Sequence, residues 1–246
     1  MNNIWYENMK KLIIIPAYNE AASIENTVKS VMQSSPDYDF VIINDCSTDE
    51  TAQICKRNHY NYVDLPVNLG IGGAVQTGYR YAFNNGYDIA VQIDADGQHN
   101  SEYLDKMAEE LVKQKADMII GSRFIENVGF QSTFLRRIGI VFFSKLIKLL
   151  TGGIVTDPTS GLRMVGRDGI ELFANDYPSD YPEPETAAAL LCRGHKVVEM
   201  PVVMNERQGG QSSINAVKSI YYMLKVTLAI FVETSRGKGL IWKQHE

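Results

Sequence analysis

Short apolar runs alternate with segments of helical periodicity along the first half of the chain. The runs lie at residues 11–17, 40–45, 62–66, 88–94 and 116–123 and are rich in Ile, Val and Leu. Between them, apolar residues recur three and four positions apart, as at Leu104, Met107, Ala108, Leu111 and Val112. Continuously apolar strands are typical of parallel sheets that helices cover on both faces. The pattern predicts one α/β domain with a mostly parallel sheet.

The second half of the chain is less regular. Residues 135–150 and 214–232 are strongly apolar with sparse lysines, a pattern found in helices that lie at a membrane surface. Packing in the core or in an oligomer is the alternative interpretation of both segments. No stretch reaches the roughly 18 consecutive apolar residues of a membrane-spanning helix. We therefore expect a chain that does not cross a membrane.

Length and charge narrow the possibilities further. The 246 residues suit one large α/β domain, and the formal net charge of −5 gives no support to nucleic-acid binding. Cys46, Cys55 and Cys192 are scattered without metal-ligand spacing, which fits a reducing compartment. The N-terminus lacks the apolar core of a signal peptide. These features favour a cytoplasmic location.

Polar residues follow three of the predicted strands. The first segment is IIIPAYNE at 13–20, the second is IINDCSTDET at 42–51, and the third is VQIDADGQH at 91–99. In the second segment, Ser47 and Glu50 have the S-x-x-E form of a capping box, which predicts the start of a helix. In a parallel sheet the three strand ends lie side by side at one edge, where such sheets bind ligands.

These residue types suit a nucleotide with a diphosphate. Asp45 can accept hydrogen bonds from a base or ribose, and the third segment can meet the diphosphate. Closely spaced carboxylates with an amide are hard oxygen ligands for Mg²⁺ or Mn²⁺. We expect Asp96 and Gln98 to be the inner metal ligands, with Asp94 supporting the metal or contacting a sugar.

Seven segments of the chain resemble, in their order and spacing, those of family 2 glycosyltransferases of the GT-A fold. They are PAYNE, NDCSTD, NLGIGGA, DADGQH, GSRF, DPTSGLRM and ERQGGQSSI. The similarity covers roughly residues 11–215 and is greatest to the dolichyl- and polyprenyl-phosphate hexose synthases. It implies a Rossmann-like, mostly parallel sheet flanked by helices. It also implies a nucleoside-diphosphate sugar donor, a divalent cation and inversion at the anomeric carbon. Residues 11–125 would bind the nucleotide sugar, residues 126–215 would form the acceptor side, and residues 214–234 would form a C-terminal apolar helix of the single domain 1–246.

The resemblance carries site residues over one by one. Positions matching the family's nucleotide-sugar contacts are Pro16, Ala17, Tyr18, Asn19, Glu20, Asp45, Gly72, Gly73, Asp94, Ala95, Asp96 and Ser160. Asn44 and Cys46 depart from the D-D-G-S form that many relatives have around the aspartate. For the two glycines, close packing of a helix on the sheet is the alternative to nucleotide contact.

Catalytic roles follow from the same resemblance. Asp96, Arg123 and Arg207 match positions near the metal, the diphosphate or an acceptor phosphate, where arginine stabilises the leaving group. Many relatives carry an acidic E-D motif as general base, and YPEPET replaces it here, so that Glu183 and Glu185 only occupy its neighbourhood. An ionised lipid phosphate needs no strong base, and this departure favours a phosphate acceptor.

The sequence thus predicts an inverting, metal-dependent transfer of a hexose to polyprenyl phosphate at the cytoplasmic face of a membrane. Contact with the membrane would be peripheral or through a membrane-protein partner. One alternative is transfer to a glycan hydroxyl with Glu183 or Glu185 as base. Another is a non-catalytic protein that binds nucleotide sugars. A nucleotidyltransferase is disfavoured because the chain lacks a basic glycine-rich N-terminal loop.

Overall fold

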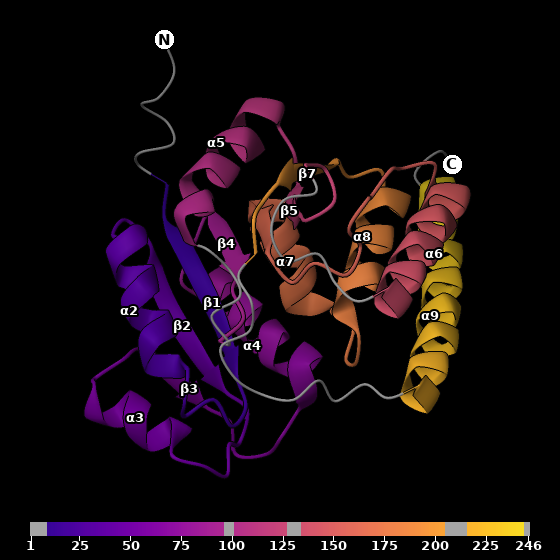
Figure 1. Cartoon of the computed structure of the whole chain (residues 1–246). Coiled ribbons are helices and arrows are strands. Elements are labelled where there is room, and N and C mark those ends of the chain that lie inside the picture. The colour runs from indigo at the N-terminus through magenta and orange to yellow at the C-terminus, as the bar shows by residue number, and fades with distance from the viewer. Residues whose placement is uncertain (1–8, 96–100, 127–133, 205–215, 244–246) are drawn as a thin grey trace.

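Strands from both halves of the chain form one sheet in the computed structural model, which describes residues 9–95, 101–126, 134–204 and 216–243 (Figure 1). The strands are β1 (Lys11–Ala17), β2 (Asp39–Asn44), β3 (Tyr62–Asp64), β4 (Ile89–Gln92), β5 (Met118–Ser122), β6 (Arg163–Gly166) and β7 (Val197–Pro201). Their order across the described sheet is β3-β2-β1-β4-β6-β5-β7.

All strand pairs are parallel except those that β6 makes with β4 and β5. The mostly parallel sheet predicted from the apolar runs is therefore confirmed. Strand β6 was not predicted, because its short segment RMVG carries an arginine and follows a turn-rich stretch. Its antiparallel pairing places Arg163 opposite Gln92 of β4.

Helices cover both faces of the sheet, as expected from its apolar strands. They are α2 (Ile24–Ser34), α3 (Thr51–Arg57), α4 (Gly70–Asn84), α5 (Leu104–Gln114), α6 (Phe134–Thr151), α7 (Arg167–Asn175), α8 (Pro182–Cys192) and α9 (Ala216–Lys243), with a 3₁₀ turn at Ser101–Tyr103. Ile13 and Ile15 of β1 face the core formed with α2 and α5, whereas Leu12 and Ile14 face the core formed with α4, α7 and α8. Alternation along each strand thus builds two apolar cores.

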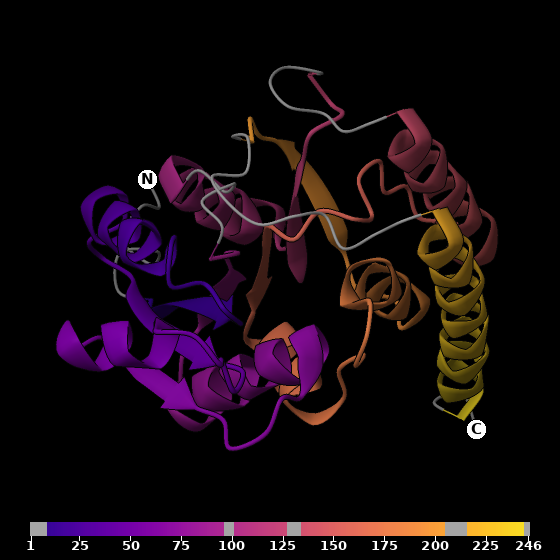
Figure 2. The same cartoon turned by 60° about the horizontal axis from the view of Figure 1, so that its bottom comes forward.

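Helices α6 and α9 lie side by side at the edge of the molecule, with α8 between them and the sheet (Figure 2). Tyr222 of α9 packs edge-on against Tyr181, with ring centroids 4.6 Å apart, and against Phe143 of α6 at 5.5 Å. Arg193, just after α8, pairs with Glu233 of α9 at 2.6 Å. Within the described residues, no helix has both the length and the hydropathy to cross a membrane.

The predicted capping box at 47–50 is wrong. Helix α3 begins at Thr51, and Ser47 accepts a hydrogen bond from another loop. Asp49 takes over the local role, because its carboxylate accepts bonds from the Thr51 N–H at 2.9 Å and from the Ala21 N–H at 3.0 Å. These bonds hold the pKa of Asp49 below its ordinary value, although burial opposes them.

Candidate functional site

The carboxyl ends of β2, β1 and β4 lie next to one another, since these three strands are adjacent and parallel. This confirms that the three polar segments share one edge of the sheet. Pro16 and Ala17 are buried at the end of β1, whereas the Tyr18 side chain is half exposed beyond it. The side chains of Pro16 and Ala17 thus pack in the interior, and a nucleotide contact by either residue stays a prediction.

The first and second polar segments are tied together by hydrogen bonds. Asn19 has a left-handed backbone conformation, with φ of 57°. Its N–H donates to Ser47 Oγ at 2.9 Å, and its side-chain Oδ1 accepts from the Thr48 N–H at 2.8 Å. The Glu20 N–H donates to Thr51 Oγ1 at 2.9 Å. The two segments thus form one connected polar surface above β1 and β2.

Asp45 is buried at the end of β2. Its Oδ1 accepts a hydrogen bond of 2.7 Å from the Leu69 N–H, which precedes α4. Its backbone carbonyl accepts a bond from Asn68 Nδ2 at 3.1 Å. A carboxylate at the start of a helix also interacts favourably with the helix dipole. One oxygen of Asp45 therefore orders the start of α4, and a base contact would use the other oxygen.

Gly72 makes a close approach between α4 and the loop that precedes α8. A methyl group on Gly72 would lie 2.0 Å from the Pro178 carbonyl oxygen and 2.4 Å from that of Ser179. The Gly72 N–H donates to the Ser179 carbonyl at 3.1 Å. Gly73 has Leu69 as its nearest neighbour at the corresponding position. Backbone packing thus requires Gly72, and a nucleotide contact by either glycine stays a prediction.

The third polar segment follows β4. Gln92 is buried, and its Nε2 donates to Asp94 Oδ1 at 3.2 Å, while its Oε1 has no hydrogen-bond partner among the described residues. Ala95 is also buried, and its carbonyl accepts a bond from Thr27 Oγ1 at 2.9 Å. Asp96 and Gln98 lie outside the described residues. In the described part, Asp94 is therefore the only predicted metal ligand that can be placed.

Arg123 forms a buried ion pair. Its Nε and Nη2 each donate to the Asp157 carboxylate at 2.7 Å, and Nη2 also reaches Thr159 Oγ1 at 3.0 Å. Asp157 is fully buried, and its backbone N–H donates to Glu199 Oε1 at 2.8 Å. Burial raises the pKa of the Glu199 carboxyl above its ordinary value. The arginine predicted at the diphosphate thus also holds the loop at 157–160, and Asp157 offsets its charge.

Ser160 has a structural partner for its hydroxyl. Its Oγ donates to the Gly121 carbonyl of β5 at 2.6 Å, and its N–H donates to the Asp157 carbonyl at 3.2 Å. The side chain is buried. A sugar could therefore meet Ser160 only as a hydrogen-bond donor to its oxygen.

Arg163 is a buried charged residue that sequence reasoning missed. Its guanidinium bonds to two carbonyls of the 157–160 loop and to Thr186 of α8. The signal in the sequence was one arginine inside the short apolar run LRMV. Such a position is ambiguous, because an isolated arginine in an apolar run is usually exposed at the end of a strand.

The candidate acids lie in the first turn of α8, as predicted from the alanine-rich stretch. Glu183 and Glu185 are both half-buried there. Negative charge in the first turn of a helix is favourable, so both acids also have a structural reason to be present. Arg207 lies outside the described residues. No cluster of three metal-binding side chains is found in the described ranges.

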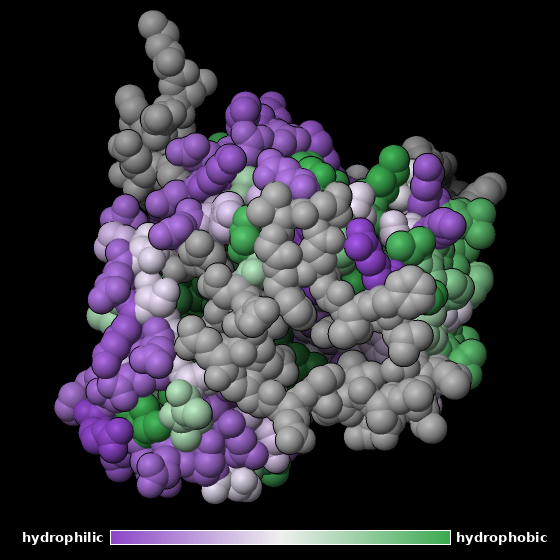
Figure 3. All heavy atoms as spheres, viewed as in Figure 1, coloured by the Kyte–Doolittle hydropathy of each residue, from purple (hydrophilic) through white to green (hydrophobic). Residues whose placement is uncertain are grey.

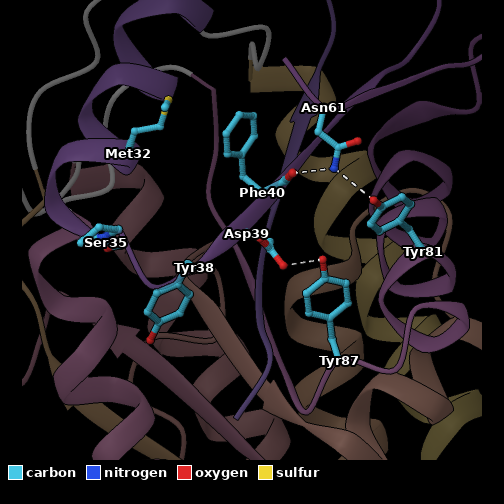
Figure 4. Close-up of a pocket in the computed structure, with 9 residues that line it drawn as sticks. Met32, Ser35, Tyr38, Asp39, Phe40, Asn61, Tyr81 and Tyr87 are labelled. Atoms are coloured by element: carbon cyan, nitrogen blue, oxygen red, sulfur yellow. Dashed lines mark hydrogen bonds between the residues drawn. The ribbon is translucent and has the colours of Figure 1, made fainter. Parts of the chain in front are cut away.

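A separate pocket lies at the opposite edge of the sheet (Figure 4). The pocket lies near the amino ends of two strands. Asp39 and Phe40 begin β2, and Asn61 comes directly before β3. The polar groups in it bond to one another, since Tyr87 Oη donates to Asp39 at 2.8 Å and Asn61 Nδ2 donates to Tyr81 Oη at 3.1 Å. This pocket is therefore not part of the site formed by the strand ends.

Comparisons with known proteins show what the chain is similar to. The model of the family described as Glycosyl transferase family 2 matches residues 12–173. A UDP-N-acetylglucosamine–dolichyl-phosphate N-acetylglucosaminyltransferase of Methanococcus voltae is 30% identical over 77% of this chain and 83% of its own length. An undecaprenyl-phosphate mannosyltransferase of Micrococcus luteus is 28% identical, with 84% and 88% covered.

A solved structure shows the same fold. Glucosyl-3-phosphoglycerate synthase from Mycobacterium tuberculosis, in complex with Mn²⁺, uridine diphosphate and phosphoglyceric acid, superposes with a TM-score of 0.67 at 16% identity. The match covers 92% of this chain and 79% of that chain. The fold class expected from the sequence is thereby confirmed.

Proposed function

Because the chain belongs to glycosyl transferase family 2, we propose that this glycosyltransferase moves a hexose from a nucleoside-diphosphate sugar to a polyprenyl phosphate. The donor half of the proposal rests on one observation: the carboxyl ends of β2, β1 and β4 lie next to one another and carry the polar segments. Asn19 links the first two polar segments there, and Asp94 follows the third strand. The acceptor half is supported by the two polyprenyl-phosphate relatives.

A divalent cation fits the donor chemistry. Asp94 offers a half-buried carboxylate at the strand end, and Asp96 and Gln98 follow it in sequence. A bound Mg²⁺ or Mn²⁺ would neutralise the diphosphate and so make it a better leaving group. The Mn²⁺ in the synthase structure is consistent with this choice.

The transfer itself inverts the anomeric carbon. An acceptor phosphate oxygen attacks this carbon from the face opposite the diphosphate, forms the new C–O bond and breaks the bond to the leaving oxygen. Arg207 and Arg123 would stabilise the negative charge that develops on the leaving diphosphate, and Asp157 would hold the Arg123 guanidinium in place. Asp45, Tyr18 and the joined loops would hold the nucleoside.

The direct test is release of nucleoside diphosphate from UDP-, GDP- and dTDP-sugars with Mn²⁺, with and without a short polyprenyl phosphate. We expect turnover with one donor and dependence on the lipid phosphate. If the lipid phosphate did not change the rate of turnover and a glycan raised it, the hydroxyl acceptor would be favoured. Donor binding without turnover in any combination would favour a non-catalytic nucleotide-sugar-binding protein.

Removing the acids of α8 separates the two acceptor classes. Glu185→Gln and Glu183→Gln are each expected to leave most of the kcat with polyprenyl phosphate, because an ionised phosphate oxygen needs no base. For a hydroxyl acceptor, loss of the general base would lower kcat by about 10²–10⁴-fold. Steady-state rates of both variants, normalised to wild type, measure the difference. Glu171→Gln, on the exposed side of α7, is a matched control.

An apolar surface on α6 and α9 suits peripheral contact with the membrane that holds such a lipid. Exposed apolar side chains recur at helical spacing on one face of each helix, and the space-filling view shows apolar side chains over these two helices (Figure 3). They are Ile138, Val141, Phe142 and Leu149 on α6 and Tyr221, Leu224, Leu228, Phe231 and Val232 on α9. The opposite faces pack inside the protein through Phe143, Ile147, Val226 and Ile230. An exposed apolar face opposite a buried one points to an external apolar partner.

Charged substitutions on this face should weaken binding to lipid vesicles. The double variant Leu224→Glu with Leu228→Glu is expected to reduce co-sedimentation with phosphatidylcholine–phosphatidylglycerol vesicles by about tenfold or more, since each buried leucine contributes roughly 1.5–3 kcal/mol. Met32→Glu, at another exposed apolar position, on α2, serves as control. Unchanged vesicle binding with a change from dimer to monomer would assign the face to a second copy of the chain.

A further inference from the structure

Arg163 lies where the two halves of the candidate site meet. It begins β6 and stands opposite Gln92 of β4 on one side and level with Ile120 of β5 on the other. Directly opposed residues of antiparallel strands project to the same face of the sheet, so Arg163 and Gln92 are neighbours, and Gln92 in turn donates to Asp94. The Arg163 side chain is 1% exposed, which is rare for arginine.

Three hydrogen bonds engage the Arg163 guanidinium. Nε donates to the Ser160 carbonyl and Nη2 to the Pro158 carbonyl, both at 2.7 Å. Nη1 donates to Thr186 Oγ1 at 2.8 Å, and that hydroxyl donates in turn to the Pro182 carbonyl at 2.7 Å. One side chain thus connects β6, the 157–160 loop and the N-terminal half of α8.

The charge of Arg163 has no direct counter-ion in the part of the chain that the structure describes. Burial lowers the pKa of the guanidinium, and Glu183, in the first turn of α8, is the foremost of the groups that oppose this shift. An arginine stays protonated even when buried. A buried cation is costly, and its hydrogen bonds must be good for the fold to tolerate it. An apolar side chain in its place would leave the Pro158 and Ser160 carbonyls without this donor, so the guanidinium serves to hold these groups in position.

We propose that Arg163 is a positioning residue for sugar transfer: it fixes the 157–160 loop and the start of α8 against the end of β4. The inference rests on the proposed function. The donor nucleotide is held by loops after β1 and β2, and none of the Arg163 bonds reaches them. The acceptor side includes Thr159, Glu183 and Glu185. These residues belong to the two segments that Arg163 binds, the 157–160 loop and α8. Loss of the guanidinium should therefore misplace the acceptor side and lower turnover much more than nucleotide affinity.

The test uses Arg163→Lys in the full chain. Lysine keeps the charge but cannot reach three acceptors in the geometry of a planar guanidinium. We expect kcat to fall by about 10²-fold, the effect of a small misplacement of the reacting groups, while the KM for the donor sugar changes by a much smaller factor. The Kd of UDP or GDP with Mn²⁺, measured by calorimetry, should likewise change much less than kcat, with full stoichiometry.

Two further variants separate positioning from general damage. Thr186→Val removes one of the three bonds and should lower kcat by a smaller factor. Arg80→Lys removes a 3.0 Å bond from an arginine to the Ala174 carbonyl, outside the site, and should change neither kcat nor Kd. Hydrogen exchange gives a readout that does not depend on activity. In Arg163→Lys, amides of segments 156–162 and 182–187 should exchange faster, while those of 12–20 and 41–46 should not.

The outcomes are distinct. Wild-type kcat in a fully folded Arg163→Lys, or equal weakening of nucleotide binding and turnover, would overturn the proposal. Absence of turnover in the wild-type protein with every donor and lipid phosphate would instead refute the proposed function. Hydrogen exchange would then still decide whether Arg163 holds both segments.

Discussion

Replacing Asp94 with asparagine is expected to lower kcat/KM for sugar transfer by about 10²–10³-fold, the range found when one group that stabilises transition-state charge is removed. Asp94 follows β4 at the edge that β1 and β2 share, and its carboxylate is the described member of the predicted metal-binding set. Asparagine keeps the size of the side chain and an oxygen that can still accept the hydrogen bond from Gln92. It lacks the negative charge that holds a divalent cation. Release of nucleoside diphosphate over a range of Mn²⁺ concentrations measures the effect.

The matched control lies at the other end of the same strand. Asp88 precedes β4, accepts a bond from the Lys10 N–H and pairs with Arg167 at 3.3 Å. Asp88→Asn should leave kcat/KM near wild type. If Asp94→Asn retained full activity at low Mn²⁺, the metal-binding role of the third polar segment would have to be abandoned.

Replacing Asp157 with asparagine is expected to reduce the free energy of unfolding by about 3–5 kcal/mol, because it leaves the Arg123 charge buried without its partner. Asp157 is fully buried and receives two bonds from the guanidinium and one from the Arg123 N–H at 3.1 Å. Urea-induced unfolding monitored by circular dichroism gives the value. Asp176→Asn, whose carboxylate is exposed and lies 3.4 Å from Arg193, should have little effect.

A double variant divides the structural role of Arg123 from its catalytic one. Arg123→Met with Asp157→Leu replaces the whole pair by apolar side chains, which often restores stability. We expect this variant to recover much of the lost stability but not the turnover. Turnover that recovers together with stability would show that Arg123 serves the fold alone, and its assignment to the leaving diphosphate would be withdrawn.

Local patterns were enough to predict most of the sheet. The runs before Pro16, Asp45 and Asp94 are almost continuously apolar, with Asn44 and Gln92 as polar exceptions near their ends, and such runs are typical of buried strands. Their polar ends had to share an edge once the strands were parallel. The antiparallel strand β6 was not predicted because its four residues, one of them an arginine, are too few to show the alternation of a strand. The strands with which it pairs are also distant in sequence.

Hydrogen-bond partners were beyond the reach of sequence. Asp49 rather than Ser47 supports the start of α3, because Ser47 is used by Asn19 from a different loop. Two interpretations of Gly72 were open, nucleotide contact and close packing, and the Pro178 carbonyl in the space of its missing side chain shows the close packing. In both cases the competing partner is far away along the chain.

The sequence by itself determined the family, the parallel strands and which polar segments gather at their carboxyl ends, since these depend on periodicity and on motifs of neighbouring residues. Only the tertiary structure decided which polar groups are engaged with one another. In the fold, Arg123 pairs with Asp157, and the Ser160 hydroxyl donates a hydrogen bond to the Gly121 carbonyl. Arg163 is buried between the two halves of the site. A buried polar group must find a partner wherever the fold brings one within reach, and that choice is made by packing between segments rather than by local sequence.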